Sequence, residues 1–273
     1  MPAPDDDLAL LADAARAAGE IALRYWKKAP EVWEKAEGAG PVTEADLAVN
    51  RMLARELRAA RPDYGWLSEE SEDGPARLEA EHVFIIDPID GTRAFLRGED
   101  TFAHSLAVAR RGEVIAAAVF LPALGRLYSA SLGAPALCNG AALAVSPTAR
   151  PEGATLLTSQ AGMRPGLWPG GVPDVRRGFH TSLAYRLCLV AEGRYDAAVT
   201  LRDAFEWDIA AGDLIARRAG ATVSDKLGQR LAYNAPTPRA AGMLAAPPKL
   251  HAALMTHLAA PQSPAGAPTS PAD

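Results

Sequence analysis

The sequence contains few cysteines, few aromatic residues and no excess of positive charge. Of 273 residues only 2 are cysteine and 6% are aromatic, and 28 basic residues stand against 33 acidic ones, for a formal net charge of -5. Cys138 and Cys188 give neither a metal-ligand spacing nor a disulfide framework, so we expect two small buried hydrophobic side chains. Because there is no basic excess to attract a polyanion, we expect no nucleic-acid partner.

Long apolar runs are also missing. No segment approaches the roughly 20 apolar residues that a membrane-spanning helix needs, so we expect no insertion into a membrane. The acidic residues Asp5, Asp6 and Asp7 are not the basic start of a secretory signal, and we therefore expect a cytoplasmic protein. The length suffices for one large domain, or two closely packed ones, with a sizeable core.

The most informative stretch is residues 83–92, VFIIDPIDGT, in which an apolar run ends in two carboxylates. Its first four residues are β-formers without polar alternation, which is typical of a strand buried on both faces, although a run this short also suits a helix. We expect the strand to stop at Asp87, because Pro88 has no N–H for the ladder and Gly91 permits a conformation that other residues resist. Asp87 and Asp90 should then project together from a tight turn.

The residues after Thr92 contain no helix breaker, so a helix can begin there and place the N–H groups of the turn at its N-terminus, where anions bind. Carboxylates that suit a cation would lie beside amides that suit an anion, which indicates a phosphate handled through a metal ion. The negative net charge agrees, because an acidic protein repels phosphates unless a cation intervenes. The alternative is a turn that only changes the chain's direction. Pro88 argues against a phospho-aspartate mechanism, because haloacid-dehalogenase-like phosphatases carry their nucleophilic aspartate at that position.

Two amphipathic helices are predicted before this stretch. Apolar residues recur at three- and four-residue intervals over residues 8–26, and a second helix should run from Thr43 to about Ala60. Thr43 and Asp46 have the spacing of a capping box, which is a sufficient structural explanation for Asp46. The loop or hairpin between the helices carries Lys35, by itself an ordinary solvated lysine.

Further acids and strands flank the central stretch. Glu69 and Glu70 end a short apolar approach, and since neighbours on a strand point to opposite faces, at most one should meet the aspartates; a surface charge pair is the alternative. Three β-rich runs with short turns then predict an antiparallel meander at residues 102–110, 113–121 and 126–131.

The second half predicts strands alternating with helices, a layered arrangement that ends in a helix from Pro248 to Leu258. Residues 161–178 are rich in Gly and Pro and form a segment long enough to suggest a functional flap. Asp208 begins a helix, where an N-cap is the structural explanation. We therefore expect a mixed α/β (α+β) fold in three parts: helices and an antiparallel sheet in 1–145, an α/β subdomain in 146–260 and a disordered tail in 261–273.

The order of these motifs is more specific than any one of them. Val-Thr-x-x-Asp, Glu-Glu-Ser, Asp-Pro-Ile-Asp-Gly-Thr and Trp-Asp-Ile-Ala-Ala-Gly follow one another as in the inositol monophosphatase superfamily, which the chain resembles from its first helix to about Leu258. The resemblance implies a layered α-β-α-β-α sandwich. It also implies a cytoplasmic, lithium-sensitive, magnesium-dependent phosphatase that acts on a small phosphorylated metabolite and is often a homodimer.

The resemblance implies a set of metal ligands, most of them in the first part of the chain. The first magnesium ion would be bound by Glu69, Asp87 and the carbonyl of Ile89, and Glu69 would also approach a weaker third ion. The second ion would be bound by Asp87, Asp90 and Asp208. Such a set suits Mg²⁺, which takes six oxygen ligands and binds through a few carboxylates plus substrate phosphate.

The resemblance also assigns the groups that act on water and phosphate. Asp46 and Thr92 would orient or deprotonate the attacking water, with Glu69 beside them, in a displacement without a covalent enzyme intermediate. The amides of Gly91 and Thr92 would hold the phosphate, and Asp208 would lie beside the bound substrate. Lys35 would lie in a mobile loop that approaches the metal site.

The residues that would select the substrate match the superfamily less closely. The inositol-specific branch has an acidic residue seven positions before the Trp-Asp aspartate, and Leu201 stands there in this chain. That departure weakens the case for inositol phosphate. The run 188–193 and Glu206 are similar to the corresponding residues of bacterial 3'(2'),5'-bisphosphate nucleotidases. These enzymes convert 3'-phosphoadenosine 5'-phosphate to AMP. In such an enzyme the bidentate fork of Arg186 or Arg202 would meet the second phosphate, although both arginines would equally suit the surface.

Other substrates and one other class of function remain open from the sequence. Inositol 1-phosphate, histidinol phosphate and sugar bisphosphates are alternative substrates within the superfamily. A regulatory binding protein on the same fold is the alternative of another class. Intact acidic motifs argue against it, because repelling carboxylates have no evident use without a metal.

Overall fold

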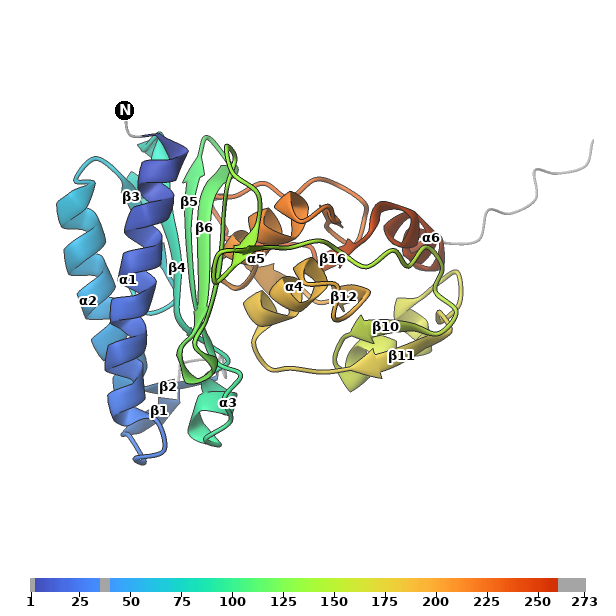
Figure 1. Ribbon diagram of the computed structural model, residues 1–273, viewed down its shortest axis with the longest axis horizontal. Helices are drawn as coiled ribbons and strands as arrows, with labels where there is room; N and C mark the ends of the chain where they lie inside the picture. The colour runs from blue at the N-terminus through green and yellow to red at the C-terminus, as the bar shows by residue number, and fades with distance from the viewer. Residues whose placement is uncertain (1–2, 35–39, 260–273) are drawn as a thin grey trace, which may run out of the picture.

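The computed structural model describes residues 3–34 and 40–259 and consists of alternating layers of helices and sheets (Figure 1). In order, the layers are two helices, a seven-stranded sheet, two helices, a five-stranded sheet and a last helix, which confirms the predicted α-β-α-β-α sandwich. Within these residues no helix is both long and apolar enough to cross a membrane. The expectations for Lys35 and for the tail at 261–273 lie outside the described residues.

The seven-stranded sheet contains the central stretch of the sequence. Its order is β3-β4-β5-β6-β7-β8-β9, with β3 parallel to β4 and every later pair antiparallel, which confirms the meander. The strands are β3 (Gly65–Ser68), β4 (His82–Asp90), β5 (Ala103–Arg110), β6 (Glu113–Leu121), β7 (Arg126–Ser131), β8 (Leu137–Cys138) and β9 (Ala141–Ala142).

Strand β4 is longer than the sequence predicted. It continues through Pro88 to Asp90 instead of stopping at Asp87, and its register against β5 shifts between Asp87 and Asp90. A bulge of this kind leaves residues outside the ladder, so the missing N–H of Pro88 removes no ladder bond. The turn follows at Gly91, whose φ of 93° is left-handed, and helix α3 (Thr92–Leu96) begins there as predicted.

Helices α1 (Pro4–Tyr25) and α2 (Glu44–Ala60) cover one face of this sheet (Figure 1). The predicted capping box is present, since Thr43 Oγ1 accepts from the N–H of Asp46 at 3.3 Å and Asp46 Oδ2 accepts from the N–H of Thr43 at 2.8 Å. The strands β1 (Val32–Glu34) and β2 (Pro41–Thr43) pair antiparallel, and both lie between the helices in the sequence. The apolar stripes that the helices bury consist of Leu11, Ala15, Ala18 and Ala22 in α1 and Val49, Leu53 and Leu57 in α2.

Helices α4 (Leu183–Ala191) and α5 (Glu206–Arg218) pack between the two sheets (Figure 1). They approach so closely that a Cβ added to Gly212 of α5 would lie 2.6 Å from Leu187 Cβ of α4. Helix α6 (Pro248–Leu258) has the predicted bounds and packs on the five-stranded sheet. That sheet has the order β11-β10-β12-β16-β14, with strands β10 (Ala154–Leu157), β11 (Val175–Gly178), β12 (Ala197–Thr200), β14 (Thr222–Ser224) and β16 (Met243–Ala246).

The predicted flap at 161–178 is more regular than the sequence suggested. It contains parts of two short 3-10 helices (Gln160–Met163 and Pro165–Leu167) and ends in β11. Its tryptophan, Trp168, is buried and donates from Nε1 to the carbonyl of Gly162 at 2.7 Å, which folds the segment onto itself.

The predicted division at residue 145 lies where the chain passes from the first sheet to the second. Helix α5 nevertheless packs against β5 and β6 of the first sheet, and one apolar cluster includes Val119 and Leu214 together. The two parts therefore share a core, and the boundary stays a prediction. Cys138 and Cys188 are free and buried, as expected.

Candidate metal centre

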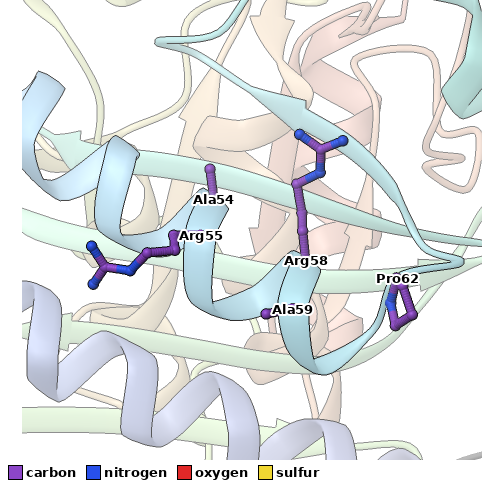
Figure 2. Close-up of a pocket in the computed structure, with 5 residues that line it drawn as sticks. All are labelled: Ala54, Arg55, Arg58, Ala59 and Pro62. Carbon is purple, nitrogen blue, oxygen red and sulfur yellow. The ribbon is translucent and has the colours of Figure 1, made fainter.

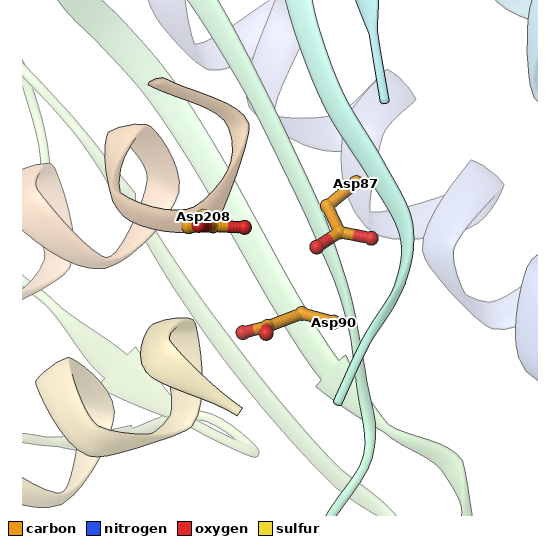
Figure 3. Close-up of side chains that lie close together, drawn as sticks. All are labelled: Asp87, Asp90 and Asp208. Carbon is orange, nitrogen blue, oxygen red and sulfur yellow. The ribbon is translucent and has the colours of Figure 1, made fainter. Parts of the chain in front are cut away.

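Three aspartates converge where β4 meets α5 (Figure 3). On a regular strand, residues three apart point to opposite faces, but the bulge in β4 brings the carboxylates of Asp87 and Asp90 together. Asp208 reaches them from the first turn of α5, and a ligand oxygen from each carboxylate lies within 4.8 Å of the others. The structure thus gathers the three side chains that the sequence assigned to the second metal ion.

Burial and mutual repulsion make it unfavourable for all three carboxylates to be ionised without a cation beside them. Burial, and then the negative charges of Glu69, Asp90 and Asp208, raise the pKa of Asp87 well above its usual value. Burial followed by repulsion from Asp90 likewise raises the pKa of Asp208. A divalent cation would offset this repulsion while the carboxylates stay ionised.

Asp87 shows directly that the cluster suits a cation. Its Oδ1 is buried and accepts no hydrogen bond from the residues that the structure describes. A buried carboxylate oxygen without a partner is unfavourable, and hard oxygen donors are the ligands that Mg²⁺ prefers. Asp208 is not the predicted N-cap of α5, which is Phe205; it lies at the third position of the helix, where a hydrogen bond with the Phe205 backbone opposes the rise of its pKa.

The N-terminus of α4 holds Asp90 in position. The Ser182 hydroxyl donates to Asp90 Oδ2 at 2.7 Å, and the N–H groups of Leu183 and Ala184 donate to its two oxygens at 3.2 and 2.7 Å. Burial raises the pKa of Asp90 to about 6 against the opposing effect of these bonds. Gly91 is required beside them, since its φ is 93° and an added Cβ would lie 3.3 Å from the backbone nitrogen of Ser182.

Glu69 approaches the cluster from the end of β3. It lies in a turn after the strand, where its N–H donates to the carbonyl of Ile86 in β4 at 3.1 Å. Of the two adjacent acids, Glu69 lines the cavity beside Asp90 and Asp208, and Glu70 does not. The expectation that at most one would face the aspartates agrees with this arrangement, but the reason is the turn and not the alternation of a strand.

Asp46 reaches the same centre from the first turn of α2. Its Oδ1 lies 3.4 Å from the hydroxyl oxygen of Thr92, while its Oδ2 accepts from Thr43. Capping and contact with Thr92 are therefore compatible uses of one side chain. Burial is the main reason that the pKa of Asp46 rises to about 7. Thr92 Oγ1 also lies 3.1 Å from the carbonyl oxygen of Ile89, the backbone group that the sequence assigned to the first metal ion.

A cavity of about 700 Å³ opens beside the aspartates. Asp90, Asp208 and Glu69 line it together with Gly91 and Thr92. A further acid, Asp203, also lines it, and so do four arginines: Arg93, Arg164, Arg186 and Arg202. The sequence drew attention to the last two and missed the first two, because they come from α3 and from the 161–178 segment and belong to no motif.

Arg186 is fixed at the wall of this cavity. Its side chain is only 7% exposed, Nε donates to the carbonyl of His180 at 2.6 Å, and the guanidinium lies 4.6 Å from the ring centre of Phe179. Burial lowers the pKa of Arg186 to about 10, which leaves it cationic at neutral pH. Phe179 and Leu167 also line the cavity, and their side chains are 48% and 42% exposed. No sequence motif indicated Phe179, an isolated aromatic residue in a loop.

A second hollow, of about 470 Å³, lies on α2 and contains none of these groups (Figure 2). The described residues that line it include two arginines and no carboxylate, so none of their side chains suits a metal ion. The residues are Ala54, Arg55, Arg58, Ala59 and Pro62.

Comparison with known proteins gives one consistent family. The family model described as Inositol monophosphatase family matches residues 4–263. An inositol-1-monophosphatase of Rhizobium meliloti (strain 1021) is 37% identical over 68% of this chain and 73% of its own length. The solved structure of the Thermotoga maritima IMPase is 30% identical, with a TM-score of 0.79 over 93% of this chain and 96% of that one.

Relatives with other names match at 31–34% identity. The 3'(2'),5'-bisphosphate nucleotidase CysQ of Shigella flexneri is 31% identical over 82% of this chain and 92% of its own. The Nus factor SuhB of Pseudomonas aeruginosa is 34% identical over 79% and 83%, and the histidinol-phosphatase of Chlorobaculum parvum is 31% identical over 82% and 87%. Identity alone therefore does not select a substrate among them.

Proposed function

Since the chain belongs to the inositol monophosphatase family of phosphatases, we propose that it hydrolyses a small phosphate monoester with magnesium bound by Asp87, Asp90 and Asp208. The observation that carries this proposal is the convergence of the three carboxylates, with Asp87 Oδ1 unpartnered among the described residues, on an arginine-lined cavity. Glu69, Asp87 and the carbonyl of Ile89 would hold a first ion, and Glu69 would also approach a third.

The protein's own groups position the attacking water. The Thr92 hydroxyl would donate its one hydrogen bond to Asp46 Oδ1, 3.4 Å away, in place of the Ile89 carbonyl, and a lone pair on Thr92 Oγ1 would accept a hydrogen bond from water. A carboxylate whose pKa is about 7 is suited to take up a proton at neutral pH. Magnesium, when bound, lowers the pKa of water and stabilises the leaving oxygen. The amides of Gly91 and Thr92, at the start of α3, would orient the phosphate.

We propose a nucleoside 3',5'-bisphosphate as the preferred substrate. A monoester with one phosphate needs little positive charge beyond the metal site, whereas the second phosphate of a bisphosphate needs its own cations. Arg186 and Arg202 lie in the cavity wall and supply them. The exposed ring of Phe179 would offer a surface on which a nucleobase can stack.

Inositol 1-phosphate is the second candidate. It is favoured by the 37% identity to a relative named inositol-1-monophosphatase. Leu201 argues against it, because this apolar residue lines the cavity where an acidic side chain would otherwise meet sugar hydroxyl groups. The homodimer suggested by the family resemblance stays a prediction, and light scattering of the purified protein would test it.

Phosphate release with MgCl₂ tests both candidates. The panel contains 3'-phosphoadenosine 5'-phosphate, inositol 1-phosphate, histidinol phosphate and fructose 1,6-bisphosphate, with Asp208→Asn as the inactive control. We expect the highest kcat/KM with the nucleotide. A preference for inositol 1-phosphate would overturn the substrate proposal and leave the phosphatase standing. Release from none of the four would favour the regulatory alternative.

A further inference from the structure

A side chain from the neighbouring strand contacts the bulge in β4. Because the register shifts between Asp87 and Asp90, Pro88 and Ile89 have no partner residues on β5. The carbonyl oxygen of Pro88 instead lies within hydrogen-bond distance of Nδ1 of His104. His104 follows Ala103, which pairs with Asp90, so this contact closes the bulge beside the carboxylates. A side chain thus replaces the ladder bond that the bulge removes.

His104 is wholly buried and uncharged. Its exposure is 0%, its ring centre lies 6.4 Å from that of Phe102 and 6.5 Å from that of Phe120, and burial lowers the pKa of His104 to about 4. The neutral ring carries one proton, and the Pro88 carbonyl can only accept, so the proton lies on Nδ1. Nε2 then accepts nothing from the residues that the structure describes.

A histidine is an unfavourable choice for this site on packing grounds alone. A valine or leucine would fill an apolar position next to two phenylalanines without burying an unpaired nitrogen, which is unfavourable. Among the residues that the structure describes, the one polar contact of the His104 side chain is the bond to Pro88. The role of His104 therefore lies in the conformation of the bulge.

We propose that His104 is a positioning residue that holds the Pro88–Ile89 bulge in the conformation in which Asp87 and Asp90 converge on the metal. The inference rests on the proposed magnesium site and adds a residue to it that binds neither metal nor substrate. Without the bond, the bulge has other conformations available, and the carboxylates would have to be ordered when the metal binds. Removal of a residue that orients a metal ligand typically lowers metal affinity by about 10–100-fold.

Amide substitutions separate this role from simple packing. In His104→Asn the side-chain NH₂ can occupy the place of Nδ1, whereas in His104→Gln it lies nearer the place of Nε2, and His104→Leu has no donor. Calorimetric titration with MgCl₂ measures the Kd of each variant, and a thermal melt without metal measures its stability. His251→Leu is the control, because this second buried histidine bonds Ser224 far from the aspartates in the sequence and the fold.

We expect His104→Gln and His104→Leu to weaken magnesium binding by about 10-fold or more and His104→Asn to stay within about 3-fold of the unsubstituted protein. His251→Leu should lower the melting temperature and leave the Kd unchanged. Equal losses in all three His104 variants, or no loss in any, would overturn the inference. If His104→Leu does not fold, the comparison of Asn with Gln still decides. Absence of magnesium binding by the unsubstituted protein would instead overturn the proposed function, and this inference with it.

Discussion

The hydroxyl oxygen of Thr92 lies 3.4 Å from Asp46 Oδ1, which joins the turn after β4 to the first turn of α2. The same hydroxyl lies 3.1 Å from the carbonyl oxygen of Ile89, and it has one proton to donate. If the Ile89 carbonyl is taken up as a metal ligand, the proton is left for Asp46. Metal binding would then also direct the Thr92 proton to Asp46, and these two side chains form the pair that positions water.

The first prediction concerns that pair. Thr92→Val keeps the shape of the side chain and removes the hydroxyl, so kcat should fall by about 100-fold or more while KM changes little. Thr92→Ser retains the hydroxyl and should keep most of the turnover. Steady-state assays of both variants give the comparison. Full turnover by Thr92→Val would remove the hydroxyl from the mechanism.

The second prediction concerns the repulsion among the aspartates. Asp208→Asn should lose turnover by orders of magnitude, as a missing metal ligand does, and yet raise the melting temperature of the metal-free protein because one of three mutually repelling groups is gone. Asp90→Asn should lose comparable turnover without the same increase in melting temperature, since Asp90 also accepts three hydrogen bonds from the start of α4. A metal-free Asp208→Asn protein that melts below the unsubstituted protein would contradict this account.

The third prediction concerns pH. In the metal-free protein, burial raises the pKa of Asp90 to about 6 and of Asp46 to about 7 from a usual value of 3.8. Between about pH 4 and 7 the folded state therefore holds more protons than the unfolded chain, and the contribution of these groups to stability falls as pH rises. Magnesium binds the ionised form, so the increase in melting temperature on adding MgCl₂ should be larger at about pH 8 than at about pH 5.

Differential scanning fluorimetry at the two pH values measures this difference. Asp87→Asn serves as the control, because loss of a ligand shared by both metal positions should make the increase small at either pH. An equal increase at both pH values in the unsubstituted protein would show that proton release does not accompany metal binding.

The fourth prediction separates the substrate residues from the metal site. Arg186→Met should raise KM for 3'-phosphoadenosine 5'-phosphate by about 10–100-fold, the cost of one charged hydrogen bond, and change KM for 3'-AMP far less. Phe179→Ala should raise KM for both nucleotides and leave that for inositol 1-phosphate unchanged. Arg55→Met, in the hollow on α2, is the matched control and should have no effect. Equal effects of Arg186→Met on both nucleotides would remove the second-phosphate contact.

The fifth prediction concerns the packing that places Asp208. A Cβ at Gly212 would lie 2.6 Å from Leu187 Cβ, so Gly212→Ala should force α5 from α4 and destabilise the protein by about 1–3 kcal/mol. Gly166→Ala adds a methyl group where no atom lies within 4 Å and serves as the control. Urea denaturation of both variants measures the difference. Equal stabilities would mean that the interhelical contact is not tight.

Several parts of the fold could be predicted from local sequence because local chemistry decides them. The capping box at Thr43 and Asp46 depends on two residues three apart, and α6 was predicted at its observed bounds, Pro248–Leu258. The meander followed from short turns between β-rich runs. The extension of β4 through Pro88 could not be predicted, because a proline is acceptable in a strand only where the neighbouring strand leaves it unpaired.

The sequence by itself determined which chemical groups are present and in which order: the acidic motifs, the glycine that permits the turn at Gly91, and the apolar stripes that place them on helices and strands. Only the tertiary structure decided which of these groups meet. Asp87 and Asp90 point to one side because β5 imposes a bulge, and Asp208 joins them because Gly212 lets α5 pack closely on α4. Arg93, Arg164 and Phe179 line the cavity without any motif. Contacts between residues distant in the chain depend on the packing of whole layers, which no local pattern encodes.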